Sequence, residues 1–98
     1  MSLPFVFRPA AEAEYLGAVA WYEAQQPGLG SDFEAEVQAV IDTIANQPDR
    51  YPAVHRDTRE APVKRFPYCV YYRVRSDRLV VLAVFHQSRD PADWQVRA

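Results

Sequence analysis

The chain has 98 residues, of which 49% are hydrophobic and 24% charged, and its formal net charge is −2. These values predict one globular domain spanning residues 1–98, large enough for a single hydrophobic core. No apolar run approaches the length of a membrane span, and the N-terminus lacks the pattern of a secretory signal. We therefore expect a cytoplasmic protein without a membrane partner.

Cysteine and histidine are scarce. Cys69 is the only cysteine, beside two histidines, so an internal disulfide is excluded and a reducing cytoplasm is the simplest setting. A structural zinc ion needs four ligands, which these residue types do not supply here. We expect no metal and no other cofactor.

Charge is distributed unevenly between the two halves of the chain. Residues 1–49 hold one Arg or Lys against eight Asp or Glu, whereas residues 50–98 hold ten against five. This asymmetry suggests an acidic partner for the basic half. It is equally explained by helices with acidic exteriors and strands that carry arginine, and both interpretations stay open.

The first half of the chain has the pattern of a short strand followed by a helical hairpin. Residues 3–7 are strand-like, and the Ala- and Glu-rich stretch 10–26 predicts a helix that Pro27 ends. Ser31 and Glu34 have the spacing of a capping box, which predicts the start of a second helix. Apolar residues then recur at helical spacing until Pro48: Phe33, Val37, Val40, Ile41 and Ile44.

The second half changes to the two-residue period of strands. Residues 51–57 suggest a loop with a short edge strand, and two β runs flank a turn at Ser76 and Asp77. A last helical turn is expected within residues 91–97. The sequence therefore predicts an α+β fold, in which an N-terminal short strand and a helical hairpin pack on one face of a small antiparallel β-sheet.

A two-residue loop at Ser76 and Asp77 would fix the register of the two long strands. Tyr68 would then face Phe85, and the shared apolar face would pack on the helices: Tyr68, Val70, Tyr72 and Val74 against Leu79, Val81, Ala83 and Phe85. The opposite face would be cationic and solvated, with Tyr71 and Arg73 on it. Cys69 is expected to be a packing residue there, with Lys64 as the one candidate partner that would lower its pKa.

Basic residues near the strand ends are the candidates for chemistry. Arg73 would lie about 20 Å from His86, too far to act on the same phosphate. A tight turn at Phe66 and Pro67 would instead place Lys64 opposite Cys69, nearer His86. The predicted cluster is Lys64, Arg65, His86 and Arg89.

The order of these signals resembles the ParE/RelE superfamily, the toxins of bacterial type II toxin–antitoxin systems, and its ParE-like branch in particular. The resemblance spans about residues 6–97. It rests on the following motifs: Trp21-Tyr22-Glu23, Pro27-Gly28-Leu29-Gly30, Pro48, Arg65-Phe66-Pro67-Tyr68, Tyr71-Tyr72, His86-Gln87-Ser88-Arg89-Asp90-Pro91, Trp94 and Arg97.

The two branches imply different functions. ParE-like toxins poison DNA gyrase through protein contact, and here the target-binding candidates are Arg65, Arg73, His86 and Arg89. RelE-like toxins cut mRNA on the ribosome with clustered basic side chains. That alternative would use the cluster of Lys64, Arg65, His86 and Arg89. It fits less well, because Cys69 stands where the RelE-like branch has an Arg, and no tyrosine follows Tyr72.

A second alternative is a superfamily member that is not toxic and serves as a binding or autoregulatory module. The resemblance also implies a cognate antitoxin, whose disordered C-terminal segment would fold over the hairpin and sheet. Tyr15, Trp21 and Tyr22 are the candidate anchors for it, as exposed aromatic residues of the first helix. A duller interpretation makes Trp21 and Tyr22 core contacts, His86 a hydrogen-bonded surface residue and Arg89 part of a turn.

Overall fold

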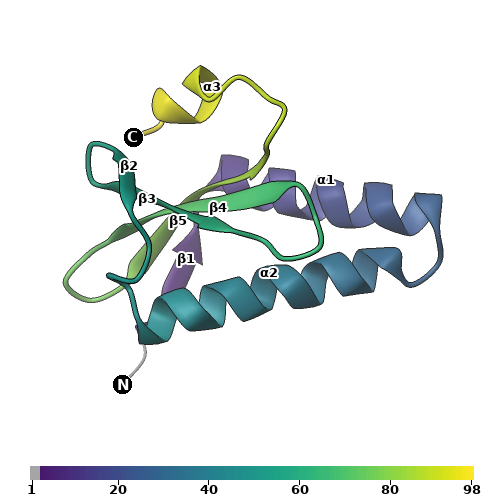
Figure 1. Cartoon of the computed structure of the whole chain (residues 1–98), viewed down its shortest axis with the longest axis horizontal. Helices are drawn as coiled ribbons and strands as arrows, with labels where there is room; N and C mark the ends of the chain where they lie inside the picture. Colours follow the sequence, from purple (N-terminus) through teal and green to yellow (C-terminus); the bar gives the residue numbers. More distant parts are fainter. Residues whose placement is uncertain (1–2) are drawn as a thin grey trace.

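A computed structural model describes residues 3–98 of the chain (Figure 1). Two long helices, α1 (Pro9–Gln25) and α2 (Leu29–Asn46), follow a short first strand, β1 (Phe5–Phe7). The remaining elements come in chain order: β2 (Ala53–His55), β3 (Thr58–Pro62), β4 (Tyr68–Val74), β5 (Leu79–His86) and the short helix α3 (Ala92–Gln95). The predicted α+β class, the helical hairpin, the edge strand and the last helical turn are confirmed.

The hairpin turn is closed by the side chain of Glu23, the last residue of the Trp21-Tyr22-Glu23 motif. The Glu23 carboxylate accepts hydrogen bonds from the Gly28 and Gly30 backbone N–H groups, at 2.9 and 3.0 Å. It therefore satisfies donors that the start of α2 would otherwise leave free. The predicted capping box is wrong, because α2 begins at Leu29 and Ser31 already lies inside the helix. A Cβ atom at Gly30 would lie 2.6 Å from the Val19 carbonyl oxygen, so glycine allows α1 and α2 to pack closely there.

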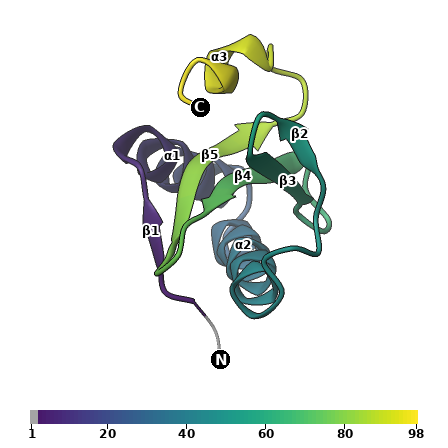
Figure 2. The same cartoon turned by 90° about the vertical axis from the view of Figure 1, so that its left-hand side faces the viewer.

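The five strands form one sheet in the order β1-β5-β4-β3-β2. Strands β2 to β5 pair antiparallel, as predicted, whereas β1 pairs parallel with β5. β1 and β5 are far apart in the sequence, with both long helices and three strands between them, so no tight turn requires them to run antiparallel. Figure 2 shows the sheet between the long helices on one side and α3 on the other.

The predicted register holds for only half of the β4–β5 hairpin. Val74 pairs with Leu79 and Tyr72 with Val81, but a bulge follows, and Tyr68 then pairs with His86 instead of Phe85. A bulge of one residue reverses which side chains face the core. Lys64 does not lie opposite Cys69 either, because Pro62 occupies that position of the β3–β4 ladder.

Both faces of the sheet are consequently covered. The face toward the helices carries the main core, which includes Phe33, Ile41 and Tyr72. The opposite face, predicted to be cationic and solvated, carries a second apolar cluster of five buried residues: Cys69, Tyr71, Ala83, Phe85 and Trp94. Trp94 comes from α3, and its ring stacks on Tyr71 with 4.1 Å between centroids.

Glu14 of α1 fixes the C-terminal segment to the sheet. Its carboxylate accepts two hydrogen bonds from Arg97, at 3.0 and 2.8 Å, and one from Arg89 at 2.9 Å. It also accepts from the Val84 backbone N–H, at 3.2 Å, beyond the end of β1 where no neighbouring strand covers β5. One half-buried carboxylate thus binds two arginines and a strand edge. Charge-assisted hydrogen bonds of this kind are among the stronger ones in proteins.

Candidate functional site

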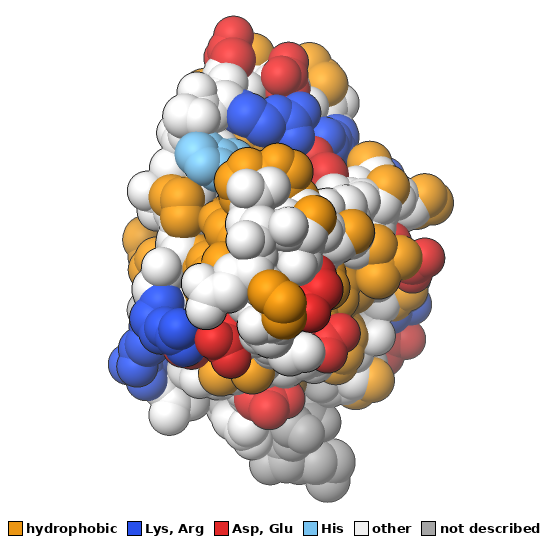
Figure 3. All heavy atoms as spheres, turned by 90° about the vertical axis from the view of Figure 1, so that its right-hand side faces the viewer, with side chains coloured by type: hydrophobic (Ala, Val, Ile, Leu, Met, Phe, Trp, Pro, Cys, Tyr) orange, Lys and Arg blue, Asp and Glu red, His pale blue; other side chains and the backbone are white. Residues whose placement is uncertain are grey.

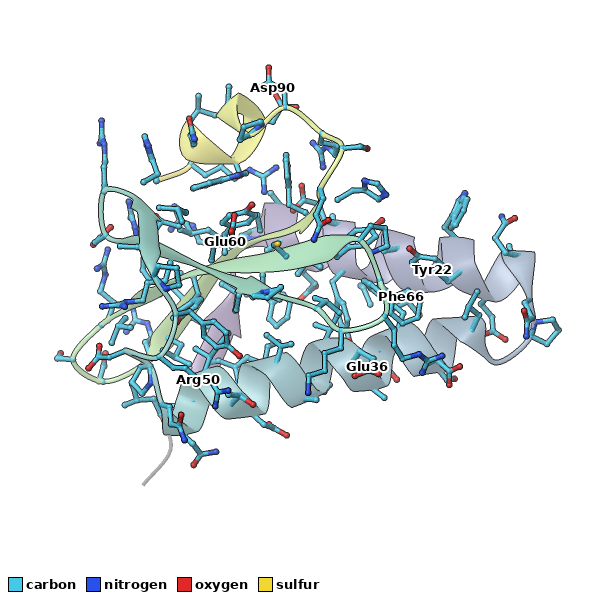
Figure 4. All side chains as sticks on the ribbon, viewed as in Figure 1. Tyr22, Glu36, Arg50, Glu60, Phe66 and Asp90 are labelled. Atoms are coloured by element: carbon cyan, nitrogen blue, oxygen red, sulfur yellow. The ribbon has the colours of Figure 1, made fainter. Side chains whose placement is uncertain are left out.

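An open hollow lies where α1 faces the start of β4 and the end of β5. We call it the aromatic hollow, and five residues line it: Trp21, Tyr22, Pro67, Tyr68 and His86. Figure 3 views the molecule from the end at which α1 and α2 meet, and shows hydrophobic side chains exposed on that face beside a histidine. In Figure 4, Tyr22 and Phe66 point toward one another from α1 and from the loop between β3 and β4. Their ring centroids are 4.9 Å apart.

Trp21 is the most exposed aromatic side chain of this hollow. It retains 59% of its accessible surface, and its ring meets Tyr22 edge to face with 5.1 Å between centroids. Tyr22 continues inward to Phe33 and Tyr68, so the exposed indole is supported by packed rings beneath it. A large, rigid apolar group held in this way is typical of an anchor for a protein partner.

His86 is held in one orientation. The Ser88 backbone N–H donates to His86 Nδ1 at 3.0 Å, and the Ser88 hydroxyl lies 2.8 Å from the same atom. A backbone N–H can only donate, so Nδ1 is the acceptor in this contact. The ring also meets Tyr68 edge to face at 5.1 Å.

The phenol groups of the aromatic hollow are uncharged at neutral pH. Burial raises the pKa of Tyr22, and burial together with the neighbouring Tyr22 raises the pKa of Tyr68 above its usual value of 10. The hollow thus combines apolar ring faces with neutral hydrogen-bonding groups. This combination suits a protein segment better than it suits a phosphate.

The predicted basic cluster does not assemble around one point. Arg65 lies 3.5 Å from Asp32 and 3.7 Å from Glu36, both on α2. Arg89 binds Glu14, and its guanidinium lies 4.1 Å from the Phe85 ring centroid. Arg65 is therefore held by carboxylates of α2, whereas Arg89 is held by a carboxylate of α1.

The other two basic candidates lie elsewhere again. Arg73 lies 3.0 Å from Asp57 in the turn between β2 and β3. Lys64 lines a separate hollow beside α2, together with Arg50. Of the candidates for target binding, only His86 lines the aromatic hollow, beside Trp21 and Tyr22.

Tyr15, which we expected to be exposed, is buried. Only 8% of it is accessible, and its hydroxyl accepts a hydrogen bond from Gln38 of α2 at 3.4 Å. Its ring packs on Phe7 and Phe33 within the main core. Trp21 and Tyr22 are therefore the accessible members of the set of candidate anchors.

Cys69 and Tyr71 lie inside the second apolar cluster. Burial raises the pKa of the Cys69 thiol, which keeps it protonated and unreactive, as its predicted packing role requires. Tyr71, predicted to be solvated, is buried and donates a hydrogen bond to Glu60 at 2.7 Å. Among residues 3–98, no group of three or more His, Cys, Asp or Glu is placed to hold a metal ion. No helix in the same range is long and apolar enough to cross a membrane.

Three residues were not predicted from the sequence to have these roles. Pro67 and Tyr68 line the aromatic hollow, and Glu14 binds Arg89 and Arg97. Tyr68 was assigned to the apolar face toward the helices and does pack against the main core, but it is only partly buried and also lines the aromatic hollow. Glu14 looked like one of many helix carboxylates, and only the fold brings Arg89 and Arg97 to it.

Fold and site together describe a small α+β protein whose open end presents aromatic rings and a fixed histidine. A family model for the ParE toxin of the type II toxin–antitoxin system parDE matches residues 5–91. The chain therefore belongs to the ParE toxin family, which confirms the resemblance to the ParE-like branch.

Comparison with solved structures agrees on the fold. A structure described as the chromosomal ParDE TA system from P. aeruginosa matches with a TM-score of 0.75 and 12% identity. The match covers 87% of this chain and 96% of that chain. Among curated proteins, none matches significantly.

Proposed function

We propose that this ParE family toxin acts in the cytoplasm by binding DNA gyrase through protein contact, and that a cognate antitoxin neutralises it. The observation that carries this proposal is the dispersal of the basic residues. Arg65, Arg73 and Arg89 each bind carboxylates of this chain, on three different parts of the fold. Phosphate cleavage without a metal requires basic groups that converge on one phosphate. Inhibition by surface contact has no such requirement.

The aromatic hollow supports a simple mode of neutralisation. Trp21 and Tyr22 are the accessible antitoxin anchors, and His86, a candidate for target binding, lines the same hollow. An antitoxin segment seated on the two aromatic rings would cover His86 at the same time. Neutralisation then follows from competition for one surface, and the chain needs no change of conformation.

Pulse labelling of DNA and protein synthesis tests the proposal, after induction of this chain alone in a bacterial host. We expect DNA synthesis to fall first and DNA breaks to appear, with translation affected later. An early fall in translation while DNA synthesis continues would contradict the proposal and favour the RelE-like mRNA endonuclease. Normal growth would favour a non-toxic binding module.

A further inference from the structure

A second hollow lies between α2 and β3, and the cations that line it have no acidic partner among residues 3–98. It has a volume of about 290 Å³; the apolar part of its lining, which we call its floor, consists of Ala39, Val40, Tyr51 and Pro62, and Thr43 lies beside it. We call it the basic hollow, because Arg50 and Lys64 line it. In Figure 4, Arg50 lies near the C-terminal end of α2, with Glu36 farther along the same helix.

The cations of the basic hollow differ from most others in the molecule. Seven arginines form ion pairs within residues 3–98: Arg59, Arg65, Arg73, Arg75, Arg78, Arg89 and Arg97. In that part of the chain, Arg50 and Lys64 form none, although the molecule is acidic overall. Two unpaired positive charges beside an apolar floor therefore leave a surface that is complementary to acidic side chains flanking an apolar one.

Contacts within the chain hold the Arg50 side chain in place beside the basic hollow. Its guanidinium donates to the Gln47 side-chain oxygen at 3.3 Å and lies 5.8 Å from the Tyr51 ring centroid. Glu36, the one carboxylate that lines the hollow, lies 3.7 Å from Arg65, which offsets its repulsion of an acidic ligand. Within the described part of the chain, Arg50 donates only to Gln47 and no carboxylate pairs with Lys64, so both can bind carboxylates of a partner.

We propose that the basic hollow binds an acidic segment of the antitoxin, with an apolar side chain on its floor and carboxylates on Arg50 and Lys64. The identity of this partner rests on the proposed function above. A nucleic acid fits less well, because two cations neutralise few phosphates and α2 itself carries Asp32, Glu34 and Glu36.

The two hollows are neighbours along one loop. Lys64 borders the basic hollow and Pro67 the aromatic hollow, and the two residues are three positions apart, at most about 11 Å. One extended segment could therefore occupy both hollows by crossing the β3–β4 loop. The antitoxin would then combine an apolar anchor at Trp21 with electrostatic contacts beside α2.

A labelled synthetic peptide of alternating glutamate and leucine is the first probe, with a glutamine–leucine peptide as its uncharged counterpart. We expect the acidic peptide to bind better at low salt and to shift the NMR amide signals of Ala39, Thr43 and Tyr51. The double variant Arg50→Gln, Lys64→Gln should bind it about five- to tenfold more weakly, since exposed ion pairs each contribute modestly. The affinity for the glutamine–leucine peptide should not change.

The chain offers a control that is matched in charge. Arg8 and Arg56 are exposed, form no ion pair within residues 3–98, and do not line the basic hollow. Arg8→Gln, Arg56→Gln changes the net charge equally and should leave the affinity for the acidic peptide nearly unchanged. Equal losses in the two double variants would overturn the proposal, because they would reflect net charge alone. Shifts confined to residues away from the hollow would overturn it too.

Growth assays identify the occupant. With Arg50→Gln, Lys64→Gln, the toxin alone should inhibit growth as the wild type does, while co-expressed antitoxin should protect the cells less. Loss of toxicity together with unchanged binding of the purified antitoxin would overturn the proposal, because the two cations would then contact the target. Failure of the proposed function looks different: the wild type itself would be harmless, and the peptide result would still decide the chemistry of the hollow.

Discussion

The two tryptophans lie in regions of opposite character. Trp94 is 2% exposed on the outer face of the sheet, covered by its own helix and secured through Arg97 and Glu14. Trp21 is 59% exposed at the other end of the molecule, on packed rings but with its own face open. The comparison indicates that the C-terminal segment stabilises the fold, whereas the end near Trp21 is available to partners. The same residue type therefore has two roles, which burial and neighbours decide.

The largest effect is expected from Trp94→Ala. Removing this ring leaves a cavity above Tyr71 and Phe85, and should lower the free energy of unfolding by about 3–5 kcal/mol. Urea denaturation measures the loss. Val96→Ala is the control, because Val96 follows α3 and is 84% exposed. A loss below 1 kcal/mol in Trp94→Ala would contradict the structural role of this segment.

Glu14→Gln should have the next largest effect on stability. The amide keeps the shape of the side chain but removes the charge that binds Arg89 and Arg97, and the expected loss is about 2 kcal/mol. Glu12→Gln on the same helix serves as the control. Hydrogen exchange should accelerate in residues 92–97 of the Glu14 variant. If exchange there stays as slow as in the wild type, Glu14 does not hold the C-terminal segment.

Trp21→Ala tests whether the exposed tryptophan contributes to binding and not to stability. Because Trp21 is largely exposed, the free energy of unfolding should change by less than about 0.5 kcal/mol. Binding of the antitoxin should weaken by about 2 kcal/mol, as expected for a central aromatic anchor. Calorimetry with purified antitoxin measures this difference, and Leu16→Ala, 54% exposed on the same helix, is the control. If the Trp21 and Leu16 variants bind the antitoxin equally well, Trp21 is not an anchor of the interface.

The smallest effect concerns pH and the turn between β2 and β3. A hydrogen bond from Arg75, with the charge of Arg73 nearby, lowers the pKa of Asp57 below its ordinary value of 3.8. Because the pKa is lower in the folded state, Asp57 stabilises the fold above its unfolded pKa, and this contribution disappears as pH falls through the folded pKa.

The stability difference between the wild type and Asp57→Asn should therefore be small near pH 7 and vanish in acid. Thermal unfolding across pH 2–7 measures it. Asp77→Asn is the charge-matched control, since among the described residues Asp77 pairs with the adjacent Arg78 alone, at 3.5 Å. A difference that grows toward low pH would have the wrong sign for this account.

Local patterns predicted the elements, and long-range geometry decided the rest. Apolar spacing in α2 and alternation in β4 are properties of neighbouring residues, so the hairpin and strands could be predicted from them. The bulge between Tyr71 and Tyr72 has no such local signature, yet it moves Phe85 to the outer face. Without it, the covering role of Trp94 could not be foreseen.

The candidate site illustrates the same division. Trp21 was assigned to the antitoxin as an exposed aromatic residue of the first helix, and His86 to the target as a basic residue near a strand end. Only the packing of α1 beside the end of β5 places them in one hollow. Conversely, Arg89 was expected either in the basic cluster or in a turn with a local ion pair, and the fold pairs it with the distant Glu14. Ion pairs between distant segments cannot be derived from spacing alone.

The most direct measurement is a cleavage assay with purified DNA gyrase and supercoiled plasmid. The account predicts that the chain alone causes linear DNA to accumulate, and that antitoxin suppresses this accumulation for the wild type. With Trp21→Ala, linear DNA should still accumulate, but suppression should require more antitoxin. If the chain produces no linear DNA at any concentration, gyrase is not its target and the central claim is wrong.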